Sequence, residues 1–106
     1  MVSRGEVWLA VLDPTVGSEI QKTRPCLVIS PPEINDYTQI VIVAPMTSGS
    51  RSAPFRVPAA FRGTDGFVLL EQVRALDRHR LVKRLGQIDQ SVLKQALSIM
   101  RALYEE

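Results

Sequence analysis

Apolar residues along this chain fall into short runs separated by turn-forming residues. Runs rich in β-branched and aromatic side chains predict strands at Glu6–Leu12, Cys26–Ile29, Gln39–Ala44, Phe55–Val57, Phe67–Ala75 and Val82–Ile88. The run Gln39–Ala44 is almost continuously apolar, which indicates a central strand buried on both faces. Proline, glycine and asparagine pairs predict the breaks, including Pro31-Pro32 and a turn over Gly63–Gly66.

The end of the chain changes to a helical period. Asp89 is placed as the N-cap of a helix from Gln90 to Tyr104. Its apolar positions form a wide stripe, which requires a packing surface on the sheet or on a partner. Several short strands and one terminal helix predict an α+β fold, and 106 residues predict a single domain over 1–106.

Net charge does not identify a binding partner, because the chain carries only +2 at pH 7. The local distribution is more informative, since residues 74–84 hold five arginines and lysines against the single acid Asp77. Such a cluster could follow a phosphate backbone, with Arg74 and Arg80 as contacts, or it could be an ordinary solvated face.

Cysteine and histidine are too scarce for several kinds of chemistry. Cys26 is the single cysteine, which excludes an intramolecular disulfide, and its apolar run predicts a buried structural role. His79 is the single histidine, so a two-histidine acid–base pair is excluded. We expect no metal and no cofactor. No apolar run approaches the ~18 residues of a membrane span, and no signal peptide is apparent, so we expect a cytoplasmic protein without membrane contact.

The loop that leads into the second predicted strand carries a carboxylate and a guanidinium, Glu19 and Arg24. Pro25 disfavours helical geometry for the preceding residue, so Arg24 should be extended at the strand entry. A guanidinium offers five donors that suit phosphate oxygens, and a nearby carboxylate can accept a proton. The loop is therefore a candidate for acid–base chemistry on a phosphate ester.

Four segments together resemble one family. DPTVGSE with TRPCLVIS, then APMTSGS at 44–50 and LLEQVRALDRHRL at 69–81, are similar to the MazF/PemK toxins of type II toxin–antitoxin systems. The resemblance covers nearly the whole chain. It implies a small SH3-like β-barrel with a C-terminal helix, CcdB/MazF-like, that forms a homodimer. It also implies a metal-independent, sequence-specific endoribonuclease that cuts single-stranded messenger RNA and is inhibited by a cognate, MazE-like antitoxin.

The resemblance implies that the RNA is cut by its own 2′-hydroxyl, which would leave a 2′,3′-cyclic phosphate or 3′-phosphate and a 5′-hydroxyl. Glu19 is our candidate base, and Arg24 is expected to stabilise the developing charge. Thr47 takes the family's second catalytic position. The expected substrate-binding residues are Ser18, Ser48, Phe55, Glu71, Gln72, Arg74 and Arg80, and Phe55 is expected to stack on an unpaired base.

Two departures from relatives limit the transfer of roles. Some relatives have an arginine where this chain has Leu69, two residues before an acid at the position of Glu71. Relatives of that kind also carry a histidine where Ser18 stands. The alternatives are a gyrase-poisoning, non-catalytic toxin related to CcdB and a nucleic-acid-binding regulatory module, for which operator DNA would be bound only together with the antitoxin.

Overall fold

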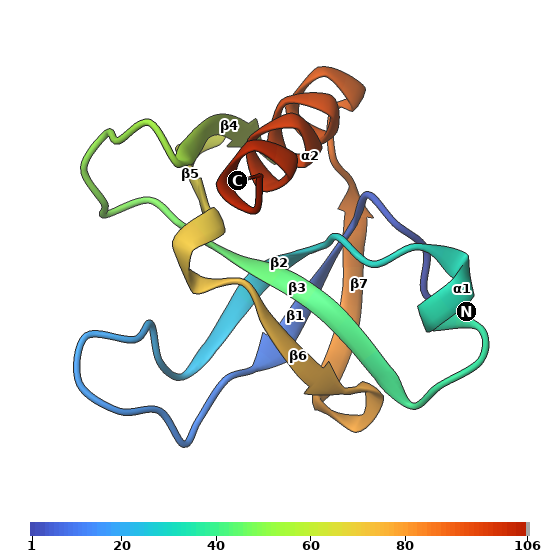
Figure 1. Cartoon of the computed structure of the whole chain (residues 1–106). Coiled ribbons are helices and arrows are strands. Elements are labelled where there is room, and N and C mark those ends of the chain that lie inside the picture. Colours follow the sequence, from blue (N-terminus) through green and yellow to red (C-terminus); the bar gives the residue numbers. More distant parts are fainter. Residues whose placement is uncertain (106) are drawn as a thin grey trace.

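The computed structural model describes residues 1–105, and its strands form a curled antiparallel half-barrel with the long helix packed on one side (Figure 1). The strands are β1 Glu6–Val11, β2 Thr23–Val28, β3 Ile40–Thr47, β4 Arg56–Phe61, β5 Thr64–Leu69, β6 Arg74–Asp77 and β7 Leu81–Gln87. The α-helices are α1 Pro32–Asn35 and α2 Gln90–Leu103, and 3₁₀ turns cover Leu70–Gln72 and Arg78–Arg80. The expected α+β class is confirmed.

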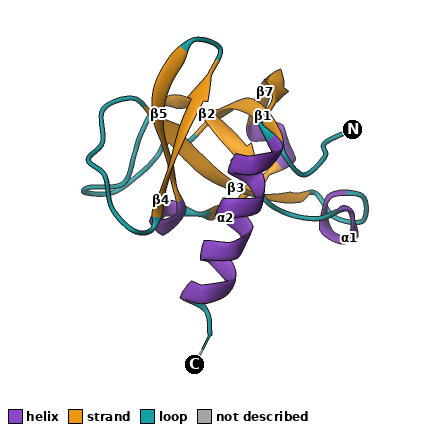
Figure 2. Ribbon diagram, turned by 90° about the horizontal axis from the view of Figure 1, so that it is seen from above, coloured by secondary structure: helices purple, strands orange, loops and turns teal. Residues whose placement is uncertain are grey.

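β3 is the central strand of this sheet. The strand order is β4-β5-β3-β2-β1-β7, and β6 pairs with β3 as well. One buried cluster lies on the α2 side of the sheet and contains Ala44 of β3, whereas a second cluster contains Val41 and Val43. The predicted burial on both faces is therefore confirmed for Val41, Val43 and Ala44, whereas Ile42 is half-buried and Ile40, at the start of the strand, is exposed. Figure 2 shows α2 crossing the sheet and continuing beyond it toward the C-terminus.

The predicted strand Phe67–Ala75 is not continuous: its two ends belong to β5 and β6, and a 3₁₀ turn separates them. β5 pairs Val68 with Met46, and β6 pairs Arg74 with Val43. Between these two pairs, β3 advances by three residues and the opposing segment advances by six. The three extra residues are taken up by the 3₁₀ turn Leu70–Gln72. Leu70 is 2% exposed and anchors the turn in the core. Glu71 and Gln72, which were expected in a strand, therefore lie in this turn.

Smaller corrections concern turns and helix ends. The β4–β5 hairpin turns at Arg62 and Gly63, which both have positive φ (52° and 81°), so the expected turn over Gly63–Gly66 begins earlier. The expected break near Pro31 contains the single helical turn α1. α2 begins after Asp89 as predicted, but the Asp89 side chain makes no capping hydrogen bond and the helix ends at Leu103.

Glu6 connects the N-terminal segment, β1 and β7. Its Oε1 accepts the Ser3 backbone N–H at 2.8 Å and the Trp8 indole N–H at 3.1 Å, and its Oε2 accepts Arg84 Nε at 2.9 Å. Burial by itself raises the pKa of Glu6, but these three hydrogen bonds to the charged form together lower it below its usual value. The ionised carboxylate is therefore part of the folded structure.

Candidate active site

The C-terminal end of β3 and the N-terminal end of β2 bring two of the predicted catalytic residues together. The two strands pair with Cys26 opposite Pro45. Two residues further along each strand, this antiparallel register places Arg24 beside Thr47. The carboxyl end of the central strand thus presents a hydroxyl next to a guanidinium. Pro25 follows Arg24 within β2, so the arginine has the extended backbone that the sequence predicted.

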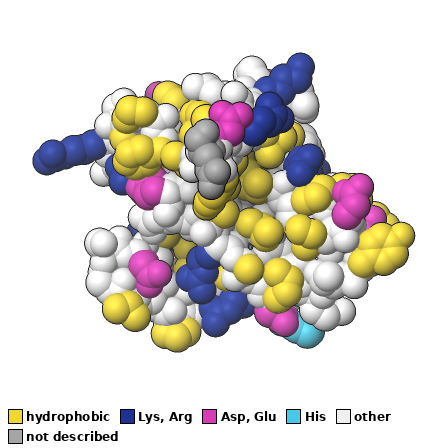
Figure 3. All heavy atoms as spheres, viewed as in Figure 1, with side chains coloured by type: hydrophobic (Ala, Val, Ile, Leu, Met, Phe, Trp, Pro, Cys, Tyr) yellow, Lys and Arg dark blue, Asp and Glu magenta, His cyan; other side chains and the backbone are white. Residues whose placement is uncertain are grey.

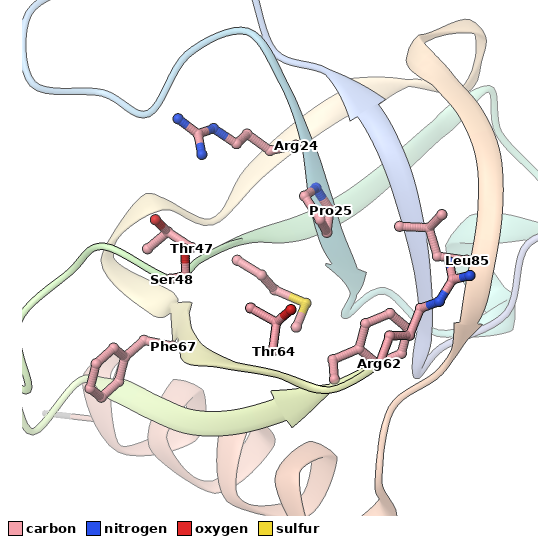
Figure 4. A pocket seen from close by; sticks show the side chains of 10 residues that line it. Arg24, Pro25, Thr47, Ser48, Arg62, Thr64, Phe67 and Leu85 are labelled. Carbon is pink, nitrogen blue, oxygen red and sulfur yellow. The ribbon is translucent and has the colours of Figure 1, made fainter.

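Arg24 and Thr47 line a pocket with a volume of about 250 Å³, called here the Arg24 pocket (Figure 4). Its other lining residues come from β2, β3, the β4–β5 hairpin and β7: Pro25, Met46, Ser48, Phe61, Arg62, Thr64, Phe67 and Leu85. Arg24, Thr47 and Ser48 lie at one end of the pocket, and Arg62 and Leu85 lie at the other. The pocket therefore combines apolar and aromatic walls with cationic and hydroxyl groups at its mouth.

Arg24 has donors to spare. The single hydrogen bond of its side chain within residues 1–105 runs from Nε to the carbonyl of Gln21 at 3.3 Å, so both terminal amino groups are unengaged there. Thr47 Oγ1 accepts the Gly49 backbone N–H at 3.2 Å, which leaves its own O–H free to donate. An anion at this end of the pocket would meet donors from both side chains.

Arg62 is a member of the pocket that sequence reasoning missed. It lies at the tip of the β4–β5 hairpin and is exposed, although the pocket also includes Phe61 and Thr64 on either side of the turn. The signal available in the sequence was the glycine at 63, directly after Arg62, and the positive φ of both residues agrees with a tight two-residue hairpin. Only the packing of the hairpin against β3 brings this arginine into the pocket that Arg24 lines, at its opposite end.

Glu19 lies in a second, larger pocket of about 400 Å³, called here the Glu19 pocket. Its lining residues are Pro14, Glu19, Ile20, Pro45, Glu71, Gln72, Val73 and Arg74. Pro45 of β3 belongs to this pocket, and the next two residues of the strand, Met46 and Thr47, belong to the Arg24 pocket. The two pockets therefore flank the same end of β3.

The Glu19 carboxylate is bonded within its own loop. Its Oε1 accepts the Val16 backbone N–H at 2.6 Å, and the Glu19 N–H donates to the Val16 carbonyl at 3.3 Å. No salt bridge to Arg24 forms among the described residues. The carboxylate is exposed, so release of one hydrogen bond would free it to turn. The structure thus places the two expected partners in neighbouring pockets rather than in contact.

The basic segment 74–84 largely binds the chain itself. Arg74 Nη1 donates to the Leu12 carbonyl at 3.1 Å, and Arg80 Nη1 donates to the carbonyls of Val11 at 3.1 Å and Asp13 at 2.6 Å. In Figure 3, basic side chains lie between the β1–β2 loop, at the lower left, and the barrel. Arg74 and Arg80 therefore fasten the root of the loop that carries Glu19.

The remaining predicted binding residues differ in their surroundings. Ser18 and Ser48 are exposed, and Ser48 lines the Arg24 pocket. Phe55 is half-buried, and the Arg56 guanidinium lies 5.7 Å from its ring centroid. Cys26 is fully buried as predicted, and burial raises the pKa of its thiol to about 12. No group of three or more His, Cys, Asp or Glu residues suited to a metal occurs among residues 1–105.

Known proteins share both this sequence pattern and this fold. Residues 3–104 match the family described as PemK-like, MazF-like toxin of type II toxin-antitoxin system. The chain belongs to this family. It is 39% identical to endoribonuclease PemK of Escherichia coli over 91% of this chain and 77% of the relative. It is 34% identical to endoribonuclease EndoA of Bacillus subtilis over 99% of this chain and 98% of the relative.

Solved structures agree with this assignment. The crystal structure of MazF from Deinococcus radiodurans superposes with a TM-score of 0.85 at 30% identity, covering 96% of this chain and 94% of that one. A MazE–MazF structure from the same organism has a TM-score of 0.78 at 27% identity, covering 96% and 93%. The predicted family and enzyme class are confirmed. No helix within the described residues is long and apolar enough to cross a membrane.

Proposed function

We propose that this PemK/MazF family member is a metal-independent endoribonuclease toxin that cuts single-stranded RNA by attack of the RNA's own 2′-hydroxyl. The observation that carries the proposal is the pair Arg24 and Thr47 at the mouth of a partly apolar pocket, with free donors on both side chains. Family membership and relatives that are named endoribonucleases support the same reaction class.

The proposed reaction forms a bond between the 2′-oxygen and phosphorus and breaks the bond from phosphorus to the 5′-oxygen. Arg24 and Thr47 donate hydrogen bonds to the non-bridging oxygens, where negative charge grows in the transition state. Glu19 takes the proton of the 2′-hydroxyl after its carboxylate turns from Val16 toward the strand end. The leaving 5′-oxygen takes up one proton, from Arg24 or from water.

The rest of the Arg24 pocket supports binding of an unpaired base. Phe61, Phe67 and Met46 provide an apolar wall for the base, while Thr64 and Ser48 offer groups that can bond to its edges. Stacking and edge recognition of splayed-out bases is the usual way in which proteins read single-stranded RNA. Arg62, at the far end, is suited to a second phosphate. The RNA therefore runs from Arg24 toward the β4–β5 hairpin.

We further propose that the protein works as a homodimer and is inhibited by a cognate antitoxin that covers this groove. The C-terminal end of α2 supports an additional interface, because Leu103 is 49% exposed and Tyr104 is 78% exposed in the single chain. The solved structure of a MazE–MazF pair at 27% identity supports the antitoxin. Sedimentation of the purified protein should give twice the mass of one chain, and a monomer would contradict this part.

The decisive experiment maps the ends of cut RNA. A long RNA incubated with purified protein in excess EDTA should be cut within single-stranded regions, giving a free 5′-hydroxyl on one product and a 2′,3′-cyclic phosphate or 3′-phosphate on the other. Replacing the ribose on the 5′ side of the scissile phosphate with deoxyribose should abolish cutting and largely preserve binding. Efficient cutting of the deoxy-substituted RNA, or activity that needs added magnesium, would contradict the mechanism.

A further inference from the structure

Two consecutive side chains of the turn Leu70–Gln72 connect the two loops that border the site. The Gln72 amide oxygen accepts the backbone N–H of Ile20 at 2.7 Å, next to Glu19. The Glu71 carboxylate accepts Arg56 Nε at 2.9 Å, and Arg56 Nη1 donates to the Arg51 carbonyl at 3.0 Å in the loop that follows Ser48. Gln72 thus reaches the Glu19 loop directly, whereas Glu71 reaches the loop after Ser48 through Arg56.

The hydrogen bond from the Ile20 N–H to Gln72 differs from the other bonds of the Glu19 loop because it leads out of the loop to the barrel. The root of that loop is held by Arg74, by Arg80 and by the backbone hydrogen bond from the Leu12 N–H to the Lys22 carbonyl. Between residues 14 and 20, the other hydrogen bonds in the described chain run within the loop, from Val16 to Glu19 and back. Among residues 1–105, the Gln72–Ile20 bond is thus the one hydrogen bond that fixes the Glu19 side of the loop to the barrel.

The turn itself is firmly placed. Leu70 is 2% exposed, and β5 and β6 on either side of the turn both pair with β3. β3 also carries Thr47. A group that is hydrogen-bonded to a side chain of this turn is therefore held in place relative to the end of β3. Through its bond to the Ile20 N–H, Gln72 holds the backbone beside Glu19 in this way.

We propose that Gln72 is a positioning residue, which sets the place of Glu19 relative to Arg24 and Thr47 by holding the Ile20 N–H through its amide oxygen. The role in catalysis rests on the function proposed above, whereas the hydrogen bond can be tested without RNA. A backbone N–H can only donate, so the amide oxygen must face it. The competing role is direct contact with RNA through the amide NH₂, which the sequence had suggested.

Two substitutions separate these roles. Gln72→Glu keeps an acceptor for Ile20 but removes the NH₂ donor and adds negative charge. Gln72→Met keeps the length of the side chain and removes both groups. A positioning role predicts that Gln72→Met lowers turnover and that Gln72→Glu keeps it. An RNA-binding role predicts that both variants lower turnover.

The first measurement is amide hydrogen exchange at Ile20 in the free protein. Exchange should be about tenfold faster in Q72M, since one net hydrogen bond is lost, and unchanged in Q72E. Exchange at buried β3 amides, such as that of Val43, is the internal control and should not change in either variant. Equal Ile20 exchange in the wild type and Q72M would overturn the proposal, whether or not the protein cuts RNA.

The second measurement is turnover of the mapped RNA. Q72M should lower kcat by about ten- to a hundredfold through misplacement of the base, with a much smaller change in KM. Q72E should keep kcat near the wild-type value, with KM raised by its added charge. A Q72E protein with protected Ile20 and a kcat as low as that of Q72M would overturn the positioning role. If Q72M does not fold, Q72E still decides the question, because the proposal requires it to keep both protection and kcat.

Discussion

Gly66 offers the sharpest test of how the fold supports the end of β3, where Thr47 lies. This residue of β5 lies opposite Ala59 of β4, and β5 passes over the end of β3. A Cβ atom added to Gly66 would stand 3.0 Å from the Thr47 carbonyl carbon and 3.2 Å from Ser48 Cα, and closer still to the Thr47 carbonyl oxygen. All three are backbone atoms, so no rotamer change can relieve the overlap.

The Gly66→Ala substitution must therefore push the Thr47–Ser48 backbone away or open the β3–β5 pairing. Overpacking of this kind costs about 1–3 kcal/mol of unfolding free energy. A displacement of about 1 Å at a catalytic hydroxyl is worth about a hundredfold in turnover. We expect Gly66→Ala to show both effects, with the loss of turnover exceeding what the unfolded fraction explains.

Urea denaturation and turnover at saturating RNA measure the two effects separately. Gly49→Ala is the matched control, because it adds the same methyl group in the adjoining loop with its nearest neighbour 3.9 Å away, at Thr47 Oγ1. The control should keep stability and turnover close to wild type. Wild-type values for Gly66→Ala would refute the packing argument, and equal losses in both variants would show that the overlap at Gly66 is not their cause.

Three further predictions concern single groups. Arg24→Ala should lower kcat by about 10²–10³-fold in RNA cleavage assays. Thr47→Ala should lower kcat less, because a charged donor is stronger than a hydroxyl. An Arg24→Ala protein with wild-type kcat would contradict the proposed mechanism. The pKa of Glu6 is lowered in the folded state, so its stabilisation is present above its unfolded pKa of about 4.3 and is lost as pH falls through the lower folded value. Urea midpoints should then show that Glu6→Gln destabilises at pH 7 and much less near pH 2, and a penalty that does not change with pH would count against the ionised carboxylate. The Cys26 thiol, with a pKa raised to about 12 by burial, should resist alkylation at pH 8 until urea unfolds the protein, and rapid labelling of the native state would show that the strand opens.

The sequence determined the elements whose signals are local. Alternation and β-branched runs placed most of the strands, and a continuous apolar run identified β3 as central because burial on both faces leaves no polar position. Pro25 restricts its neighbour directly, so the extended backbone of Arg24 could be predicted. Four short motifs in the right order were enough to indicate the family, because their residue types and spacing are properties of the chain alone.

The tertiary structure decided which residues meet. The excess of three residues opposite β3 turned a predicted strand into the turn Leu70–Gln72, and that excess is visible only when both pairings are known. The basic segment suggested a phosphate track or a solvated face, and the fold shows that Arg74 and Arg80 each direct Nη1 to backbone carbonyls at the root of the Glu19 loop. Residue types show what a side chain can bond to, and only the fold shows which partner is within reach.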